Sequence, residues 1–308
     1  MLVVTASSAA LLLTRLAPGD AATQLGAFAK PEEIEAARAR LDLDRSPLEQ
    51  WAIWGSRALR LDFGTSLLYN RPVRPLVLRA AANTALLGVT ALLMATVLGI
   101  TLGIFTGSQP RRPAALLVRA ASIACISLPP LLTSLLLVFL AARTGWFPLG
   151  GMTSIGAVES SWTVWMLDVV RHLPLPVLAL ALPVAATFER LQAQAMGETI
   201  GQPFVTAAVA RGVRERDVIV RHAWPVSLRP ICAVYGLAIG AMLSGSFAVE
   251  YITQWPGLGR MVYEALRARD IYLVAGCAAM GALLLAIGTL VGDLLLAAVE
   301  PRVRDGET

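Results

Sequence analysis

The sequence is poor in charged residues and rich in long stretches that contain none. Charged side chains make up 15% of the 308 residues and hydrophobic ones 56%, and the mean hydropathy is +0.65. A soluble globular domain carries about 25% charged residues, so a water-soluble fold is excluded. A lipid core admits only segments that satisfy their own backbone hydrogen bonds. The composition therefore predicts an all-α polytopic membrane protein.

Lysine, histidine and cysteine are scarce, which argues against catalysis and metal binding. The single lysine, Lys30, precedes a proline and does not lie in a Gly-Lys-Ser/Thr loop, so the chain is not itself an ATPase of that type. His172 and His222 are expected on opposite sides of the membrane, and no HExxH, CxxC or G-x-S-x-G motif occurs. We expect no catalytic residue, no metal site and no directly bound cofactor. The cysteines all fall in apolar stretches, where they are expected as filler without disulfides: Cys125, Cys232 and Cys277.

Six stretches are candidates to cross the membrane. The stretch 173–188 is followed by the ionisable residues Glu189 and Arg190, which we expect either to neutralise each other or to snorkel to the interface. The stretch 1–16 is too short, and we expect it to be the remnant of a first span truncated at its start. The other four contain no charged residue and are as long as the roughly 20 residues that a span requires: 80–110, 120–142, 230–249 and 271–292.

Arginines predict the orientation. With the amino terminus inside, ten arginines fall in the cytoplasmic connections and tail, and five fall in the short outside loops, as the positive-inside bias requires. Residues 17–78 then form a small outside cap with short helices over 31–41 and 47–61, followed by a turn at Asp62–Thr65. Residues 79–300 form a five-helix core, and residues 301–308 form a cytoplasmic tail.

The loop 198–230 is the most informative polar segment. Small residues at Ala207 and Ala208 give a slim helix surface, Gly212 predicts a helix stop, and 217–224 predicts a second short helix. Two short helices at a sharp angle would protrude from the membrane as a knob. On composition alone, an ordinary basic loop is an equally good interpretation.

This loop resembles the EAA loop of ABC-importer permeases, in the variant found in B-type subunits of the dipeptide/oligopeptide/nickel family. Pro225-Val226 departs from the family pattern, so we expect the second helix to end early. Segments 15–20, 41–44 and 62–66 resemble the cap of the B-type subunits, and 249–270 resembles the loop before the last span. The matching positions in the loop are Ala208, Ala210, Arg211, Gly212, Arg221, His222, Ala223 and Pro230.

The resemblance implies a MetI-like fold, which is the type I ABC-importer permease fold, with about six transmembrane helices and an extracytoplasmic cap after the first. It implies a pore subunit in a bacterial or archaeal cytoplasmic membrane, with peptides as the expected substrates. The implied partners are a homologous C-type permease, one or two ATPase subunits that bind ATP and Mg, an external substrate-binding protein and membrane lipid, but no nucleic acid. The alternative is an ion-coupled secondary transporter, which would need internal repeats that the sequence does not show.

The candidate site residues form three groups. Residues in the loop are expected to couple the chain to the ATPase: Ala207, Ala208, Gly212, Val213, Arg214, Glu215, Arg221, His222 and Pro230. Polar residues and a proline pair are candidates for the translocation path or its gating: Asn83, Pro129, Pro130, Glu250 and Asp293. An outside loop is expected to contact the binding protein, with a membrane-surface tryptophan anchor as the alternative: Trp255, Pro256 and Gly257. For the proline pair a kink is the structural expectation.

Overall fold

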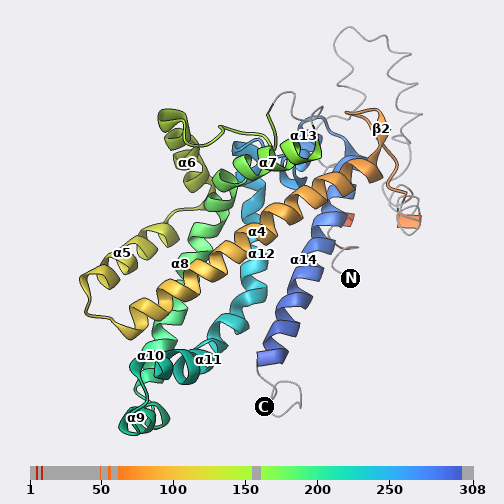
Figure 1. Ribbon diagram of the computed structural model, residues 1–308. Coiled ribbons are helices and arrows are strands. Elements are labelled where there is room, and N and C mark those ends of the chain that lie inside the picture. The colour runs from red at the N-terminus through yellow and green to blue at the C-terminus, as the bar shows by residue number, and fades with distance from the viewer. Residues whose placement is uncertain are drawn as a thin grey trace, which may run out of the picture. The chain divides into compact units, whose positions relative to one another are not determined.

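The computed structural model describes residues 62–154 and 161–299, together with Thr5, Ser8, Ala9, Glu49, Gly55 and Ser56 (Figure 1). Most of the expected first span at 1–16, nearly all of the two expected cap helices and the tail at 301–308 lie outside the described residues. The boundaries expected for these regions therefore stay predictions.

Four long helices follow the expected apolar stretches: α4 (Val73–Ser108), α8 (Pro174–Ile200), α12 (Arg229–Ile252) and α14 (Ile271–Val299). Each is long and apolar enough to cross a membrane. The expectation of an all-helical polytopic membrane protein is confirmed. Helix α4 begins earlier than expected, inside the stretch that we assigned to the cap.

The apolar stretch 120–142 does not form one continuous span. It contributes to two helices, α5 (Pro113–Ser127) and α6 (Pro130–Thr144), which are bent by 111° relative to each other. Pro130 stands in the first turn of α6, where a missing N–H costs little, whereas a proline disfavours helix at the residue before it. The expected kink is thus a complete break. The described residues hold four spans, or five if the bent pair counts as one.

Short elements connect the spans. Strands β1 (Thr65–Ser66) and β2 (Arg71–Pro72) pair in antiparallel register. Helices α7 (Trp162–His172) and α13 (Leu258–Arg267) precede α8 and α14, respectively. Between α8 and α12 lie α9 (Pro203–Ala210), α10 (Glu215–Asp217), the π-helix η3 (Val218–Ala223) and α11 (Trp224–Ser227).

The described residues of one compact unit come from Met1–Ala85 and Pro256–Ala286. Its core joins apolar residues of the first turns of α4 to those of α13 and α14. Where we expected a turn, the Asp62 carboxylate accepts a hydrogen bond of 3.0 Å from the backbone N–H of Gly64, but Thr65 already belongs to β1 and the chain turns at 67–70. The hydroxyl of Tyr69 donates a hydrogen bond of 2.6 Å to Glu264 Oε2.

The buried carboxylate of Asp270 ties the β1–β2 turn to the start of α14. Its Oδ2 accepts hydrogen bonds from Ser66 Oγ at 2.5 Å, from the N–H of Leu67 at 2.7 Å and from the N–H of Leu68 at 3.1 Å. Its Oδ1 accepts from the N–H of Leu273 at 3.0 Å. Four donors therefore converge on one side chain, which fixes the turn at a defined position.

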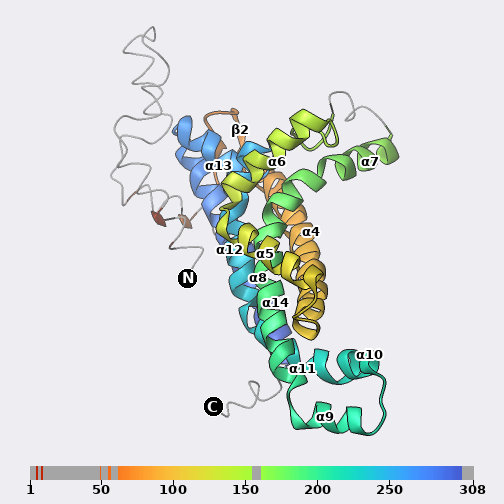
Figure 2. The same ribbon diagram turned by 90° about the vertical axis from the view of Figure 1, so that its left-hand side faces the viewer.

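The second unit comprises Leu86–Trp255 and the end of the chain from Ile287. Helix α8 is its centre and packs against α5, α6 and α12 (Figures 1 and 2). Cys125 and Cys232 are half-buried, Cys277 is buried, and the described structure shows no disulfide between them.

Three glycines of α4, spaced by four residues, bring that helix against α8. A Cβ added at Gly103 would lie 2.5 Å from the Cβ of Gln192 and 2.7 Å from the backbone oxygen of Glu189. Gly99 and Gly107 make equally close approaches to α8. Small residues allow such backbone contact between helices in a membrane.

Candidate functional site

The segment from α9 to α11, residues 203–227, is called here the coupling segment. Figure 2 shows it beyond the end of α8, with α9 beside α10 and joined to it by a tight turn. The N–H of Gly212 donates to the carbonyl of Val209 at 2.9 Å, and the N–H of Val213 donates to the carbonyl of Ala208 at 3.3 Å. These two bonds form a Schellman cap. Gly212 has φ of +82°, so its lack of a side chain is what permits the turn.

The coupling segment carries a small core of its own. Val205, Ala208 and Val218 are buried together, and Val213 packs against them. This contact holds α9 against the helix that follows the turn. The other expected coupling residues within it are exposed or half-buried on its surface: Ala207, Gly212, Arg214, Glu215, Arg221 and His222. Pro230 is exposed in the first turn of α12, after the segment.

The second helix of the coupling segment does not end early. Helical structure runs from Glu215 through η3 and α11 to Ser227, so the expectation based on Pro225-Val226 is wrong. The reason is that Pro225 stands in the first turn of α11, where a proline is compatible with helix. Arg221 lies on the exposed face, 3.7 Å from Asp217.

A buried hydrogen bond connects the coupling segment to the spans. The side-chain amide of Gln192, on α8, donates to Ser227 Oγ at 2.7 Å, and that hydroxyl donates to the carbonyl of Trp224 at 3.0 Å. Gln192 and Ser227 are both almost fully buried. Gln192 also packs on Gly103 of α4. The bond and the packing contact join α11 to α8 and α8 to α4, a connection that we did not predict from the sequence.

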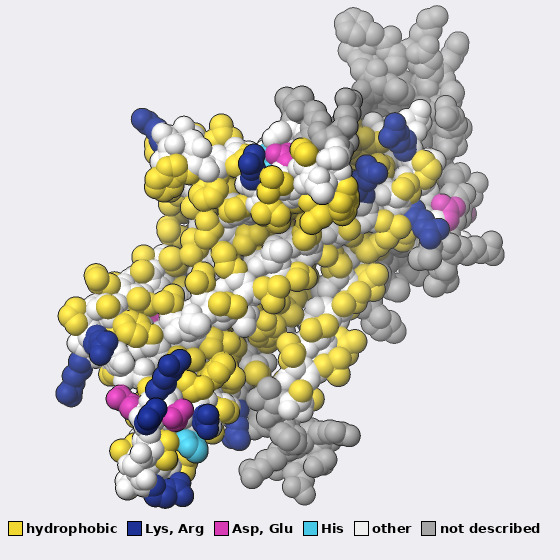
Figure 3. All heavy atoms as spheres, in the orientation of Figure 1, with side chains coloured by type: hydrophobic (Ala, Val, Ile, Leu, Met, Phe, Trp, Pro, Cys, Tyr) yellow, Lys and Arg dark blue, Asp and Glu magenta, His cyan; other side chains and the backbone are white. Residues whose placement is uncertain are grey.

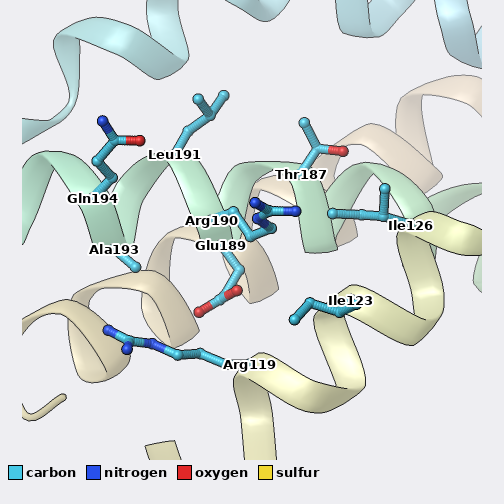
Figure 4. Close-up of a pocket in the computed structure, with 9 residues that line it drawn as sticks. All are labelled: Arg119, Ile123, Ile126, Thr187, Glu189, Arg190, Leu191, Ala193 and Gln194. Carbon is cyan, nitrogen blue, oxygen red and sulfur yellow. The ribbon is translucent and has the colours of Figure 1, made fainter. Parts of the chain in front are cut away.

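Glu189 is buried and does not pair with Arg190, which was one of the two arrangements that we expected. Its Oε1 accepts a hydrogen bond of 2.5 Å from Thr106 Oγ1 of α4, and Arg190 is exposed. A guanidinium nitrogen of Arg119 donates to the backbone oxygen of Thr106 at 3.0 Å. Figure 4 shows Glu189, Arg190 and Arg119 around a cavity between α5 and α8. Neighbouring positions on a helix point in different directions, which separates Glu189 from Arg190.

The candidates for the translocation path differ in burial and in the contacts that they make. Glu250 is fully buried near the end of α12, whereas Asp293 is exposed on α14. The amide of Asn83 donates to the backbone oxygen of Pro256 at 2.8 Å. Pro130 lies against Gly245 of α12, where an added Cβ would be 3.1 Å from the proline ring. The break between α5 and α6 is thus packed on another span.

Trp255 is fully buried within the core of the second unit, which rules out the alternative of a membrane-surface anchor. Direct contact with a binding protein is also closed to its side chain. Gly257 is buried too, so Pro256 is the exposed member of this group.

No candidate metal site is found among the described residues. Within 62–154 and 161–299, no group of three or more His, Cys, Asp or Glu side chains could hold a metal ion. Figure 3 shows hydrophobic side chains over the middle of the helices of the second unit, and Lys/Arg and Asp/Glu side chains gathered around the coupling segment. The described surface is that of a membrane-embedded bundle with a polar end.

Comparison with known proteins agrees with this geometry. Residues 99–305 match the family model described as "Binding-protein-dependent transport system inner membrane component". The chain is 30% identical over 281 residues to the oligopeptide transport system permease protein OppB of Mycobacterium tuberculosis, covering 89% of this chain and 86% of the relative. It is 28% identical over 298 residues to the oligopeptide transport system permease protein AppB of Bacillus subtilis, covering 95% and 92%.

A third relative is the glutathione transport system permease protein GsiC of Escherichia coli, 29% identical over 295 residues and covering 95% of this chain and 92% of the relative. These matches confirm the resemblance to the dipeptide/oligopeptide permeases, and they extend over almost the whole chain. The chain therefore belongs to the family of inner membrane components of binding-protein-dependent transport systems.

Proposed function

We propose that the chain is the B-type pore subunit of an ATP-driven importer of peptides. The observation that carries this proposal is the coupling segment, a rigid two-helix knob with its own core and a buried connection to α8. Such a knob transmits force to the spans only if another subunit binds it. The relatives named for oligopeptide and glutathione transport support peptides as the substrate class.

The partners follow from this role. A homologous C-type permease completes the pore, one or two cytoplasmic ATPase subunits bind ATP and Mg, and an external binding protein delivers the peptide. The chain itself then hydrolyses nothing and holds no cofactor. In this proposal the coupling segment and the amino terminus both face the cytoplasm of a bacterial or archaeal cell. The excess of arginines in the connections assigned to that side supports the orientation.

Different parts of the chain serve different steps. The exposed residues Ala207, Arg214 and Arg221 contact the ATPase, while Gly212 shapes the turn. The α5–α6 break contributes to the path or its gate, and Pro256 is the candidate contact for the binding protein. Asn83, Glu250 and Asp293 are proposed to contribute to the translocation path or its gating as well.

Purification of a tagged chain from its host tests the assembly. We expect nucleotide-binding subunits and a second permease to co-purify, because the coupling segment exposes its contact surface. The purified complex is then reconstituted with its binding protein. Dipeptides, longer peptides, glutathione and chelated nickel are compared for their ability to stimulate ATP hydrolysis and uptake.

The two classes of transporter give opposite results. A peptide that stimulates both ATP hydrolysis and uptake supports the importer. Transport by the isolated chain, driven by an ion gradient without ATP, would identify it as a secondary transporter and overturn the proposal.

A further inference from the structure

A cavity of about 600 Å³ opens between α5 and α8 in the second unit. Figure 4 shows Arg119, Ile123 and Ile126 entering it from α5, and Thr187, Glu189 and Arg190 from α8. A volume of this size lies in the range of ligand-binding pockets, about 300–1,000 Å³. The proposed contact of the coupling segment with the ATPase does not involve this cavity.

The sequence of α8 places the cavity at the edge of the hydrocarbon layer. From Pro174 to Phe188 the helix carries no charged residue, whereas Glu189, Arg190, Gln192, Gln194 and Glu198 follow within its last turns. Charged side chains concentrate where a membrane helix leaves the acyl chains. The cavity therefore lies at the depth of lipid headgroups, on the side of the coupling segment.

Glu189 lines this cavity and carries an unsatisfied acceptor that is covered in the structure. The residue is 1% exposed, and its Oε2 has no hydrogen-bond partner among the described residues, while Oε1 accepts from Thr106. A buried carboxylate oxygen without a donor is costly. A ligand that brings N–H donors would remove this cost.

Two arginines at the cavity supply positively charged hydrogen-bond donors, which complement the carboxylate of Glu189. Arg119 uses one nitrogen for the backbone oxygen of Thr106, and Arg190 is exposed at the cavity without an ion pair to a described residue. Guanidinium groups match phosphate geometry, and basic pockets between membrane helices bind phospholipid headgroups. Ile123 and Ile126 add an apolar wall, which continues into the exposed apolar face of α5.

We propose that this cavity binds a phospholipid that carries a primary amine on its phosphate, as phosphatidylethanolamine does. The phosphate lies between Arg119 and Arg190, the ammonium reaches Glu189 Oε2, and the first acyl carbons contact Ile123 and Ile126. Because Oε2 is covered in this structure, the carboxylate turns toward the cavity on binding. A choline headgroup has no N–H to donate, and a glycerol headgroup has no cation, so neither satisfies Glu189 in this way.

The test is intact-mass spectrometry of the whole importer complex, purified through a tag on this chain. The complex is equilibrated with equal amounts of three phospholipids that share acyl chains and differ in headgroup: ethanolamine, choline and glycerol. We expect roughly tenfold more ethanolamine than choline lipid on the wild type, the size of one charge-assisted hydrogen bond. Soluble phosphoethanolamine is added in a further arm, to distinguish a lipid from a free headgroup.

Two variants locate the preference. Glu189→Gln keeps an oxygen for Thr106, so it is expected to fold, but it loses the attraction for the ammonium and with it the ethanolamine preference. Arg190→Gln lowers the binding of all three lipids. Glu198→Gln is the matched control, because its carboxylate lies on the same helix and does not line the cavity, and the glutamine keeps an oxygen for its donor, the lining residue Gln194.

Equal binding of the ethanolamine and choline lipids to the wild type would overturn the proposal. So would an unchanged ethanolamine preference in Glu189→Gln of normal yield and monodispersity. Displacement of the lipid by soluble phosphoethanolamine would overturn its lipid part. The site requires only that the chain lies in a bilayer, so each of these failures leaves the transport proposal intact.

Discussion

The side-chain amide of Gln192 donates a hydrogen bond of 2.7 Å to the hydroxyl of Ser227, and both residues are buried. The bond joins the last turns of α8 to the end of the coupling segment. It is a polar contact between α11 and a span other than α12, which follows α11 directly in the chain. The first prediction concerns this pair.

Ser227→Ala removes the acceptor of a buried amide whose Oε1 already has no partner among the described residues. We expect the complex to lose about 1–3 kcal/mol of stability, because an unsatisfied buried donor is costly. The double variant Gln192→Leu with Ser227→Ala is expected to recover much of the loss, because it also removes the unpaired N–H and the unpaired oxygen of the Gln192 amide. The measurement is the temperature at which detergent-solubilised complex loses monodispersity. Ser246→Ala is the control, because that hydroxyl bonds only within its own helix; an equal loss there would contradict the pairing.

Gly212→Val is expected to insert normally and to uncouple ATP hydrolysis from uptake. Gly212 has φ of +82° and open space around it, so a side chain meets no clash and acts through the backbone alone. The left-handed conformation costs about 1–2 kcal/mol for an ordinary residue, enough to depopulate the turn by roughly tenfold. The ratio of peptide imported to ATP hydrolysed in proteoliposomes measures the effect. Gly212→Asn should be milder, because asparagine tolerates this conformation; normal uptake by Gly212→Val would refute the role of the turn.

Gly103→Ala and Gly88→Ala make a matched pair on α4. An added Cβ at Gly103 would lie 2.5 Å from Gln192 Cβ, whereas at Gly88 it meets nothing within 4 Å. We expect Gly103→Ala to destabilise the chain by about 1–3 kcal/mol through overpacking. Gly88→Ala should be neutral or stabilising by up to about 1 kcal/mol. Thermal unfolding in detergent compares the two, and equal midpoints would show that α4 and α8 are not in backbone contact.

Asp270→Asn is expected to release the β1–β2 turn. Asparagine has one acceptor oxygen where aspartate has two. If the oxygen takes the place of Oδ2, the N–H of Leu273 loses its acceptor, and if it takes the place of Oδ1, Ser66, Leu67 and Leu68 lose theirs. The loss is about 2–3 kcal/mol, and it should speed hydrogen exchange of the Leu67 and Leu68 amides by roughly tenfold to hundredfold. Ser66→Ala removes one donor and leaves the Leu67 and Leu68 bonds, so its effect should be smaller. Equal protection of these amides in wild type and Asp270→Asn would contradict the arrangement.

The raised pKa of Tyr69 predicts that the protein loses stability at high pH. Burial, together with the hydrogen bond to Glu264, raises the pKa of Tyr69 to about 12 from an ordinary value of 10.0. Because the folded pKa lies above the unfolded one, the contribution is fully present below pH 10 and is lost as the pH rises toward 12. The difference in phenolate absorbance between wild type and Tyr69→Phe should titrate near pH 12. A difference that titrates near pH 10 would show that the bond to Glu264 is absent.

The helices could be predicted because lipid imposes a simple rule on sequence. A span must be apolar for about 20 residues, so α4, α8, α12 and α14 are visible as uncharged stretches. Gly212 was predictable for a different reason, since a glycine between two helix patterns signals a left-handed cap. The contacts of individual side chains follow no such local rule, so they could not be predicted in this way.

Contacts between distant positions had to come from the structure. Glu189 stands next to Arg190 in sequence, yet it bonds Thr106, which lies 83 positions away. Asp270 and Ser66 are 204 positions apart. The spacing of Gly99, Gly103 and Gly107 was a readable signal for close helix packing, but it does not say which helix is the neighbour. A proline pair likewise predicts a kink without its angle.

The 111° break between α5 and α6 restricts what can surround that part of the chain. At the break the regular ladder of N–H to C=O bonds is interrupted, and Pro129 and Pro130 contribute no N–H. Hydrocarbon offers no partner to the carbonyl groups left over, and irregular backbone at membrane depth occurs only against protein or water. Residues 127–130 therefore cannot be bathed in acyl chains: Gly245 of α12 covers one side of the elbow, and any side that the chain's own helices leave open must face a neighbouring subunit or an aqueous passage.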